Sequence, residues 1–178
     1  MKFLLLSGLV WILILNGCDI IDQHEGKPTF TSVFEINSVN TNGTEHKILA
    51  EGWNFKIDGL RHKIIYESGF NLHIMNLDGG TIKQITNFKD RQGIFDYEIS
   101  SGAGKIVIAL YENENVDLFL SNMDGSNLTQ LTGGSEADLD PMFSPSADKI
   151  VFRRDWSICI INSDGSGFKY LSQHPDSV

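Results

Sequence analysis

A short hairpin pattern that recurs four times along the chain constrains the fold most strongly. Residues 117–132 read DLFLSNMDGSNLTQLT, in which an alternating apolar stretch runs into Asp124-Gly125 and a second, weaker stretch leaves it. Related segments are LHIMNLDGGTIKQIT at 72–86 and ICIINSDGSGFKYLS at 158–172, with a fainter copy at 36–49. Asp-Gly between such runs favours a tight type I′ hairpin, which needs positive φ at both central residues. The sequence therefore predicts one such hairpin in each copy.

The copies share a register that extends beyond the turn itself. Each has Asn three residues before the turn glycine and an apolar residue six after it, and the turn glycines are Gly43, Gly79, Gly125 and Gly165. Upstream of the three stronger copies, a Lys opens a run rich in β-branched residues, at Lys63, Lys105 and Lys149. Such runs favour buried strands.

One unit therefore reads as strand, turn, strand, loop, strand, Asp-Gly turn, strand. Four short strands with a period of about 42 residues are typical of a β-propeller blade. A single antiparallel sandwich would also contain recurring hairpins, but its strands would not carry motifs locked in register. We predict an all-β chain, a β-propeller of four-stranded antiparallel blades, with no helix after the N-terminal segment.

The segments DPMFSPSADKIVF at 140–152 and ICIINSDGSGFKYLS resemble the repeat of TolB-type propellers. That repeat pairs a Pro-x-aromatic-Ser-Pro strand and turn with Lys-Ile-x-Phe and then with an Asn-x-Asp-Gly hairpin. The resemblance covers roughly residues 30–178 and weakens toward the N-terminus, since 97–104 lacks both prolines. It implies the fold more than the function, because similar repeats occur in the propellers of prolyl-oligopeptidase-type peptidases and in surface lipoproteins.

The blade count predicts an incomplete ring. Complete units span about 50–87, 93–133 and 137–173, and residues 30–49 supply only the outer strands of another blade. About three and a half blades do not close a propeller, which typically has four to eight. We expect a partial form of a longer propeller, the alternative being a ring assembled from several chains.

The N-terminus resembles a bacterial lipoprotein signal. Lys2 precedes the apolar run FLLLSGLVWILIL, which is short for a membrane span, and the segment ends in LNGC at Cys18. Asn16 departs from the usual choice at its position. We predict a signal peptide at 1–17, lipidation of Cys18, a tether at 18–29 and a location in the bacterial cell envelope, facing the periplasm or exterior. An uncleaved anchor and an ordinary cleaved signal are the alternatives.

The remaining residues offer little catalytic chemistry. The chain has no Gly-x-Ser-x-Gly elbow, its five histidines form no short metal-binding pair, and the Asx-rich turns lack the Glu that would close a calcium loop. We predict no catalytic residue, metal site or cofactor. The net charge of −9 argues against nucleic-acid binding. Cys159, within SICII, is expected to be a small buried residue.

Loops that join the second and third strands of each blade are the best candidates for binding. They hold a set of aromatic and Arg residues, types enriched at protein interfaces: Phe70, Tyr111, Arg153, Arg154 and Trp156. Alternatively, Trp156 packs between blades and both Arg are solvated. The sequence favours a membrane-anchored lipoprotein whose non-catalytic propeller binds a protein partner. The propeller part of a peptidase and a saccharide-binding or lyase-type propeller are the alternatives.

Overall fold

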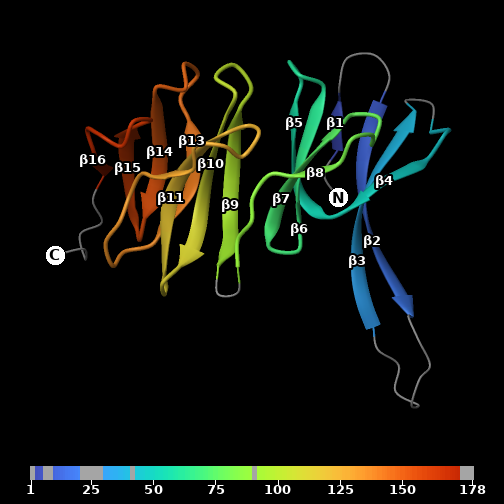
Figure 1. The fold of residues 1–178 in the computed structure, drawn as a ribbon, viewed down its shortest axis with the longest axis horizontal. Helices are drawn as coiled ribbons and strands as arrows, with labels where there is room; N and C mark the ends of the chain where they lie inside the picture. The colour runs from blue at the N-terminus through green and yellow to red at the C-terminus, as the bar shows by residue number, and fades with distance from the viewer. Residues whose placement is uncertain (1–2, 6–9, 21–29, 41–42, 90–91, 173–178) are drawn as a thin grey trace.

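The protein forms four separate antiparallel sheets of four strands each. The structure is a computed structural model that describes residues 3–5, 10–20, 30–40, 43–89 and 92–172, and it contains no helix in these ranges (Figure 1). The first sheet contains β1 (Phe3–Leu5), β2 (Val10–Ile20), β3 (Phe30–Asn40) and β4 (Lys47–Glu51). The second contains β5 (Trp53–Asp58), β6 (Lys63–Ser68), β7 (Asn71–Asn76) and β8 (Lys83–Gln84). Each sheet keeps its strands in sequence order, so neighbouring strands are joined directly.

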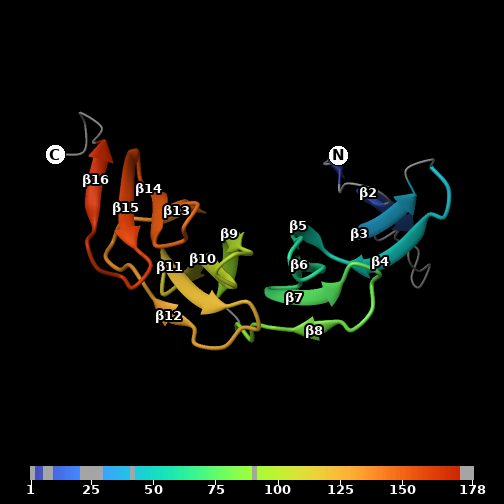
Figure 2. The same ribbon diagram turned by 90° about the horizontal axis from the view of Figure 1, so that it is seen from above.

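The last two sheets repeat the same arrangement. The third contains β9 (Gly93–Ser100), β10 (Lys105–Glu112), β11 (Asn115–Asn122) and β12 (Thr129–Gln130). The fourth contains β13 (Asp138–Phe143), β14 (Lys149–Arg154), β15 (Ser157–Asn162) and β16 (Lys169–Ser172). Seen from above, the four sheets fan out in an arc with β8 and β12 on its outer side (Figure 2). The described sheets do not close a ring, and the prediction of an incomplete β-propeller is confirmed.

The first sheet is completed by the segment that the sequence analysis assigned to a signal peptide. Strand β2 pairs with β3 along its length, from Val10↔Asn40 to Ile20↔Phe30, so the backbone of Cys18 lies opposite Ser32. The predicted partial blade, residues 30–49, supplies β3 and the start of β4. Cleavage before Cys18 would remove β1 and residues 10–17 of β2. The signal peptide, the tether and the lipidation of Cys18 stay predictions.

The two repeated motifs meet across the middle strands of each complete sheet. The Lys that opens the second strand lies opposite the Asn that ends the third, as in Lys105↔Asn122. Lys105 Nζ donates to Asn122 Oδ1 at 2.7 Å, Lys149 does the same to Asn162 at 2.8 Å, and Lys63 bonds Asn76. The recurring Lys and Asn side chains therefore hydrogen-bond each other across the two strands, which explains why their register is constant.

The Asp-Gly turns differ from the predicted type I′ geometry. At the turn after β11, φ is positive at Gly125 (84°) but not at Asp124, and Gly125 N donates to Asn122 O at 2.9 Å. The carboxylate of Asp124 accepts the N–H of Ser126 at 3.0 Å, which keeps Asp124 in the ordinary region and leaves the left-handed position to glycine. The loop is thus a three-residue connection with one left-handed residue, and the type I′ prediction is wrong here.

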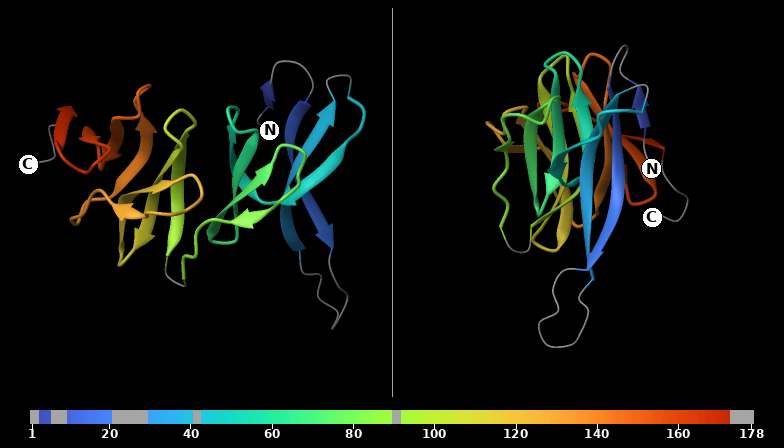
Figure 3. Two further views of the ribbon diagram at one scale, coloured as in Figure 1. Left: turned by 45° about the horizontal axis from the view of Figure 1, so that its top comes forward. Right: turned by 90° about the vertical axis from the view of Figure 1, so that its right-hand side faces the viewer.

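The core lies between sheets. One cluster joins the first and second sheets through Ile36, Leu49 and Met75, and a larger one joins the second and third around Leu72, Tyr97 and Ile106. A third joins the third and fourth sheets and includes the following fully buried side chains: Val107, Leu118, Ile150 and Cys159. Cys159 is a small buried residue, as expected. Viewed along the row, the sheets lie one behind another (Figure 3, right), and in the described residues the main contacts between sheets join neighbouring sheets.

Candidate functional site

The turns between second and third strands place three aromatic side chains at one edge of the molecule. These turns are two-residue loops, since Ser68↔Asn71, Glu112↔Asn115 and Arg154↔Ser157 are the last pairs. Phe70 and Trp156 lie within such loops and Tyr111 lies beside one, with 65%, 78% and 40% of their surface exposed. Because three sheets share one topology, these side chains lie at equivalent ends of neighbouring sheets. The exposure of Trp156 rules out its packing between sheets.

Positive φ explains how these turns are so tight. At the loop between β10 and β11, φ is 52° at Asn113 and 68° at Glu114, the two-residue geometry that requires left-handed residues at both positions. Gly69 supplies the left-handed residue between β6 and β7, with φ 63°. The sequence predicted positive φ at both turn residues for the Asp-Gly turns. The structure has this geometry in the turn between β10 and β11, at the edge opposite to the Asp-Gly turns.

Further aromatic side chains at this edge were not predicted. Phe95 is 64% exposed, and Trp53, at the start of β5, is 38% exposed with its ring centroid 6.2 Å from that of Phe34. Phe95 falls at a register shift: Ala109 pairs with Asp96 and Leu110 with Ile94, so Phe95 has no partner on β10. A β-bulge of this kind re-aims a side chain, and strand alternation in the sequence could not reveal it.

The two predicted Arg residues have different roles. Arg154 forms a bidentate ion pair with Asp138, with Nε–Oδ1 and Nη2–Oδ2 distances of 2.7 and 2.8 Å, and its guanidinium lies 4.8 Å from the centroid of the Phe168 ring. The side chains are 13% and 0% exposed. The hydrogen bonds that Arg154 donates to the carboxylate of Asp138 raise the pKa of Arg154 above its ordinary value. Arg154 is therefore neither solvated nor presented to a partner, whereas Arg153 pairs with Asp140 in a more exposed position.

A buried carboxyl group lies just beneath the aromatic edge. Glu67, on β6, is 5% exposed and accepts a hydrogen bond from Asn54 Nδ2 at 2.5 Å. Burial, which penalises the charged form, raises the pKa of Glu67, and the nearby charge of Asp96 acts in the same direction. The Tyr97 hydroxyl lies within hydrogen-bonding distance of Asn54 O and of Ile65 O and can donate its one proton to either, which ties the start of β5 to the third sheet.

The edge combines these aromatic rings with negative charge. Glu112, beside Tyr111, accepts a hydrogen bond from Gln92 Nε2 at 2.6 Å. Glu114 is exposed in the turn that directly follows Glu112, and Glu136 is exposed near Arg154, 3.9 Å from its Nη1. With Arg154 and Arg153 both paired to carboxylates, the edge offers aromatic and acidic groups to a partner.

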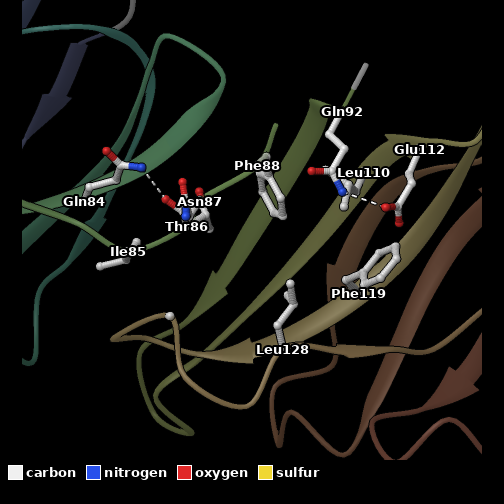
Figure 4. A pocket seen from close by; sticks show the side chains of 11 residues that line it. Gln84, Ile85, Thr86, Asn87, Phe88, Gln92, Leu110, Glu112, Phe119 and Leu128 are labelled. Atoms are coloured by element: carbon white, nitrogen blue, oxygen red, sulfur yellow. Dashed lines mark hydrogen bonds between the residues drawn. The ribbon is translucent and has the colours of Figure 1, made fainter. Parts of the chain in front are cut away.

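A cavity of about 590 Å³ opens between the second and third sheets (Figure 4). Phe88 and Phe119 are nearly buried within it, and Gln84, Asn87, Gln92 and Glu112 supply amide and carboxylate groups. Asn71 stabilises one wall of the cavity, because its Oδ1 accepts hydrogen bonds from Thr86 Oγ1 at 2.9 Å and from Phe88 N at 2.7 Å. The lining residues could hydrogen-bond an uncharged polar ligand.

Within the described ranges, no three His, Cys, Asp or Glu side chains are grouped so that they could hold a metal ion. Those ranges also contain no helix long and apolar enough to cross a membrane.

Comparison with solved structures shows a propeller fold. TolB from Acinetobacter baumannii matches with a TM-score of 0.67 and 17% identity, over 94% of this chain and 42% of that one. An oligogalacturonate lyase from Vibrio parahaemolyticus matches with a TM-score of 0.69 and 13% identity, over 97% and 59%. Pyrococcus horikoshii acylaminoacyl peptidase matches at 0.65 and 14% identity, over 97% and 27%. The chain thus has a TolB-like propeller fold and spans about two fifths to three fifths of the first two proteins.

No family model matches the chain, and a search of curated proteins finds no match. The similarity is therefore one of fold, shared by TolB, a lyase and a peptidase with different activities.

Proposed function

We propose that the protein is a lipoprotein of the bacterial cell envelope, anchored through Cys18, whose propeller binds a protein partner without catalysis. The exposed Phe70, Tyr111 and Trp156 at the turns of one edge carry this proposal. Aromatic residues are enriched at the centres of interfaces, where large rigid side chains bury area at low entropic cost.

The charge of the same edge suggests the chemistry of the partner. Glu112, Glu114 and Glu136 lie among the aromatic side chains, and the whole chain carries a net charge of −9. A Lys- or Arg-rich segment could pair with these carboxylates and lie over the aromatic faces. The proposed partner is therefore a protein with a basic surface segment.

Capture from envelope extracts tests the binding proposal. Tagged protein should retain a partner that the double variant Phe70→Ser/Trp156→Ser loses, because both substitutions remove exposed rings without opening the core. Leu60→Ser is the matched control, since Leu60 is 71% exposed in the turn between β5 and β6, at the opposite edge. Equal capture by the double variant and by wild type would contradict the proposal.

Membrane fractionation tests the anchor separately. Cys18→Ser should move the protein from the membrane fraction to the soluble fraction, since acylation of that thiol supplies the anchor. Cys159→Ala, which changes the other cysteine, should leave the distribution unchanged. A Cys18→Ser protein that still fractionates with membranes would rule out the lipid anchor while leaving the binding proposal standing.

The amide-lined cavity favours one second candidate, a saccharide-binding propeller. Gln84, Asn87 and Gln92 offer the planar donors and acceptors that hydroxyl groups pair with. Calorimetric titration with neutral oligosaccharides should then give a binding signal that Gln92→Leu removes. An absence of heat for wild type would remove this candidate, and the propeller of a peptidase would remain the other alternative.

A further inference from the structure

Another cavity, of about 420 Å³, opens between the second and third sheets at the edge that holds the Asp-Gly turns. Small-ligand sites commonly have volumes of about 300–1,000 Å³. Three side chains of the lining are cationic, namely Arg61, Lys63 and Lys83, although the whole chain carries a net charge of −9. Ile74 and Met123 supply apolar surface beside them. The cavity therefore places positive charge next to apolar side chains.

The guanidinium of Arg61 is fixed by the protein itself. Its Nη1 donates to Asp58 Oδ2 at 3.0 Å and to Ser101 O in the third sheet. Gly104, which also lines the cavity, leaves room for the guanidinium, because a Cβ there would lie 2.9 Å from Arg61 Nη2. The hydrogen bonds of this guanidinium to other described residues use Nη1, so Nη2 and Nε are left as oriented donors.

Nearby carboxylates cancel the positive charge of the lining only in part. Lys63 Nζ bonds the neutral amide oxygen of its Asn partner. Asp124, the carboxylate of the lining, accepts bonds from Ser126 N at 3.0 Å and Ser126 Oγ at 2.6 Å. The pKa of Asp124 is lowered mainly by these bonds and also by the nearby charge of Lys83. With Asp58 included, three cations face two carboxylates, which leaves one positive charge in excess.

The repeat does not require all of this charge. Arg61 stands two residues before the Lys that opens the second strand, and the third and fourth sheets have alanine at that position. Four residues after the turn glycine, the second and fourth sheets have Lys83 and Lys169, whereas the third has Thr129. Of the three complete sheets, only the second carries cations at all three positions. The other sheets pack without an Arg61 equivalent, so the packing of the fold does not account for it.

We propose that this cavity binds a phosphate group, with the guanidinium of Arg61 as an oriented two-pronged donor and Lys63 and Lys83 as point charges. A guanidinium fork matches phosphate oxygens, and a phosphate monoester carries more charge at neutral pH than a carboxylate does. Ile74 and Met123 are placed to contact the organic part of the ligand. The phosphate can belong to a small soluble molecule or to a lipid headgroup. This site lies at the edge opposite the exposed aromatic rings, so it does not rest on the proposed protein partner.

Phosphorus NMR titration of the full chain in a nonionic detergent, at neutral pH and fixed ionic strength, tests the site with inorganic phosphate. Lys83→Gln should weaken the affinity about tenfold, because it removes one charge-assisted contact. Lys169→Gln is the matched control, since it removes the same charge at the same repeat position of the fourth sheet and should bind like wild type. Arg61→Lys keeps the charge opposite Asp58 but loses the fork, so it should also bind more weakly.

Mixed micelles of the detergent with phosphatidic acid and phosphatidylcholine distinguish the two sources of the phosphate. A lipid headgroup as ligand predicts broadening of the phosphatidic acid resonance alone, at concentrations where inorganic phosphate is unaffected. Binding of inorganic phosphate itself indicates a soluble ligand. Wild type that binds neither probe would overturn the proposal. So would equal losses of binding in Lys83→Gln and Lys169→Gln, when both variants keep the far-UV circular dichroism of wild type.

Discussion

At the scale of single residues, the close approach of Gly125 to Ile85 should make the free energy of unfolding sensitive to substitution of Gly125. Gly125→Ala would force a side chain into the left-handed region, which costs about 1–2 kcal/mol, and crowd the backbone carbonyl of Ile85, which costs about 1–3 kcal/mol more. We expect the free energy of unfolding in urea to fall by about 2–5 kcal/mol. Gly69→Ala is the control, since Gly69 has φ 63° and no neighbour within 4 Å. Equal losses would show that the contact with Ile85 is unimportant.

The buried carboxyl of Glu67 should make stability depend on pH. Burial raises its folded-state pKa above the ordinary value of 4.5, so the folded protein holds the proton to higher pH than the unfolded chain does. This contribution to stability is complete below the ordinary pKa and is lost as pH rises through the raised folded-state pKa.

Glu67→Gln should abolish that loss, because the amide stays neutral and can still accept the bond from Asn54. Urea unfolding over a series of pH values from about 4 to 7 should therefore show wild type falling relative to the variant. Glu114→Gln, at an exposed carboxylate, should follow wild type. Parallel pH profiles for wild type and Glu67→Gln would contradict the expectation.

At the scale of the strand, a hydroxyl replaces a missing ladder bond beside the outer strands of the second and third sheets. The N–H of Leu118 donates to Thr132 Oγ1 at 2.9 Å, and the N–H of Leu72 donates to Thr86 Oγ1 at the same distance. Thr132→Val keeps the shape but leaves the buried N–H of Leu118 unsatisfied, which should cost about 1–3 kcal/mol of stability. Thr132→Ser, which keeps the hydroxyl, should retain most of the wild-type free energy of unfolding in urea. A stable valine variant would show that another acceptor takes over.

Such pair contacts explain which strands could be predicted from the sequence. Two pairs, Lys105–Asn122 and Leu118–Thr132, recur in the repeat because the two residues of each pair contact each other. The repeat therefore predicted the order and the period of the strands correctly. The turns were harder, because Asp-Gly flanked by apolar runs fits a two-residue and a three-residue loop equally well. The structure distinguishes them by the backbone bonds between Asn122 and Ser126 and between Gly125 and Asn122, and by the bond from Ser126 N to the Asp124 carboxylate.

Side chains at the candidate site were predictable only in part. Phe70 and Trp156 follow from turn position alone, and both are exposed. Arg154 stands beside the same turn, but Asp138 on the neighbouring strand draws it inward, a pairing that residue spacing does not reveal. Phe95 is turned outward by a register shift that no local pattern encodes.

At the scale of the whole molecule, the stacked arrangement predicts a gradient of stability. Each core cluster joins two adjacent sheets, so an inner sheet is held on two flanks and an outer sheet on one. Stability in such stacks is a sum of unit and neighbour terms, and the ends open first. Strand β10 is at most 1% exposed from Ile106 to Leu110, with side chains in two clusters.

Amide hydrogen exchange followed by mass spectrometry should resolve this gradient. Peptides from β10 and β11 should exchange most slowly, and those from β14 and β15 faster, because among the described sheets the fourth is packed on one flank only. A single exchange rate shared by all buried strands would instead mean that the four sheets unfold as one unit.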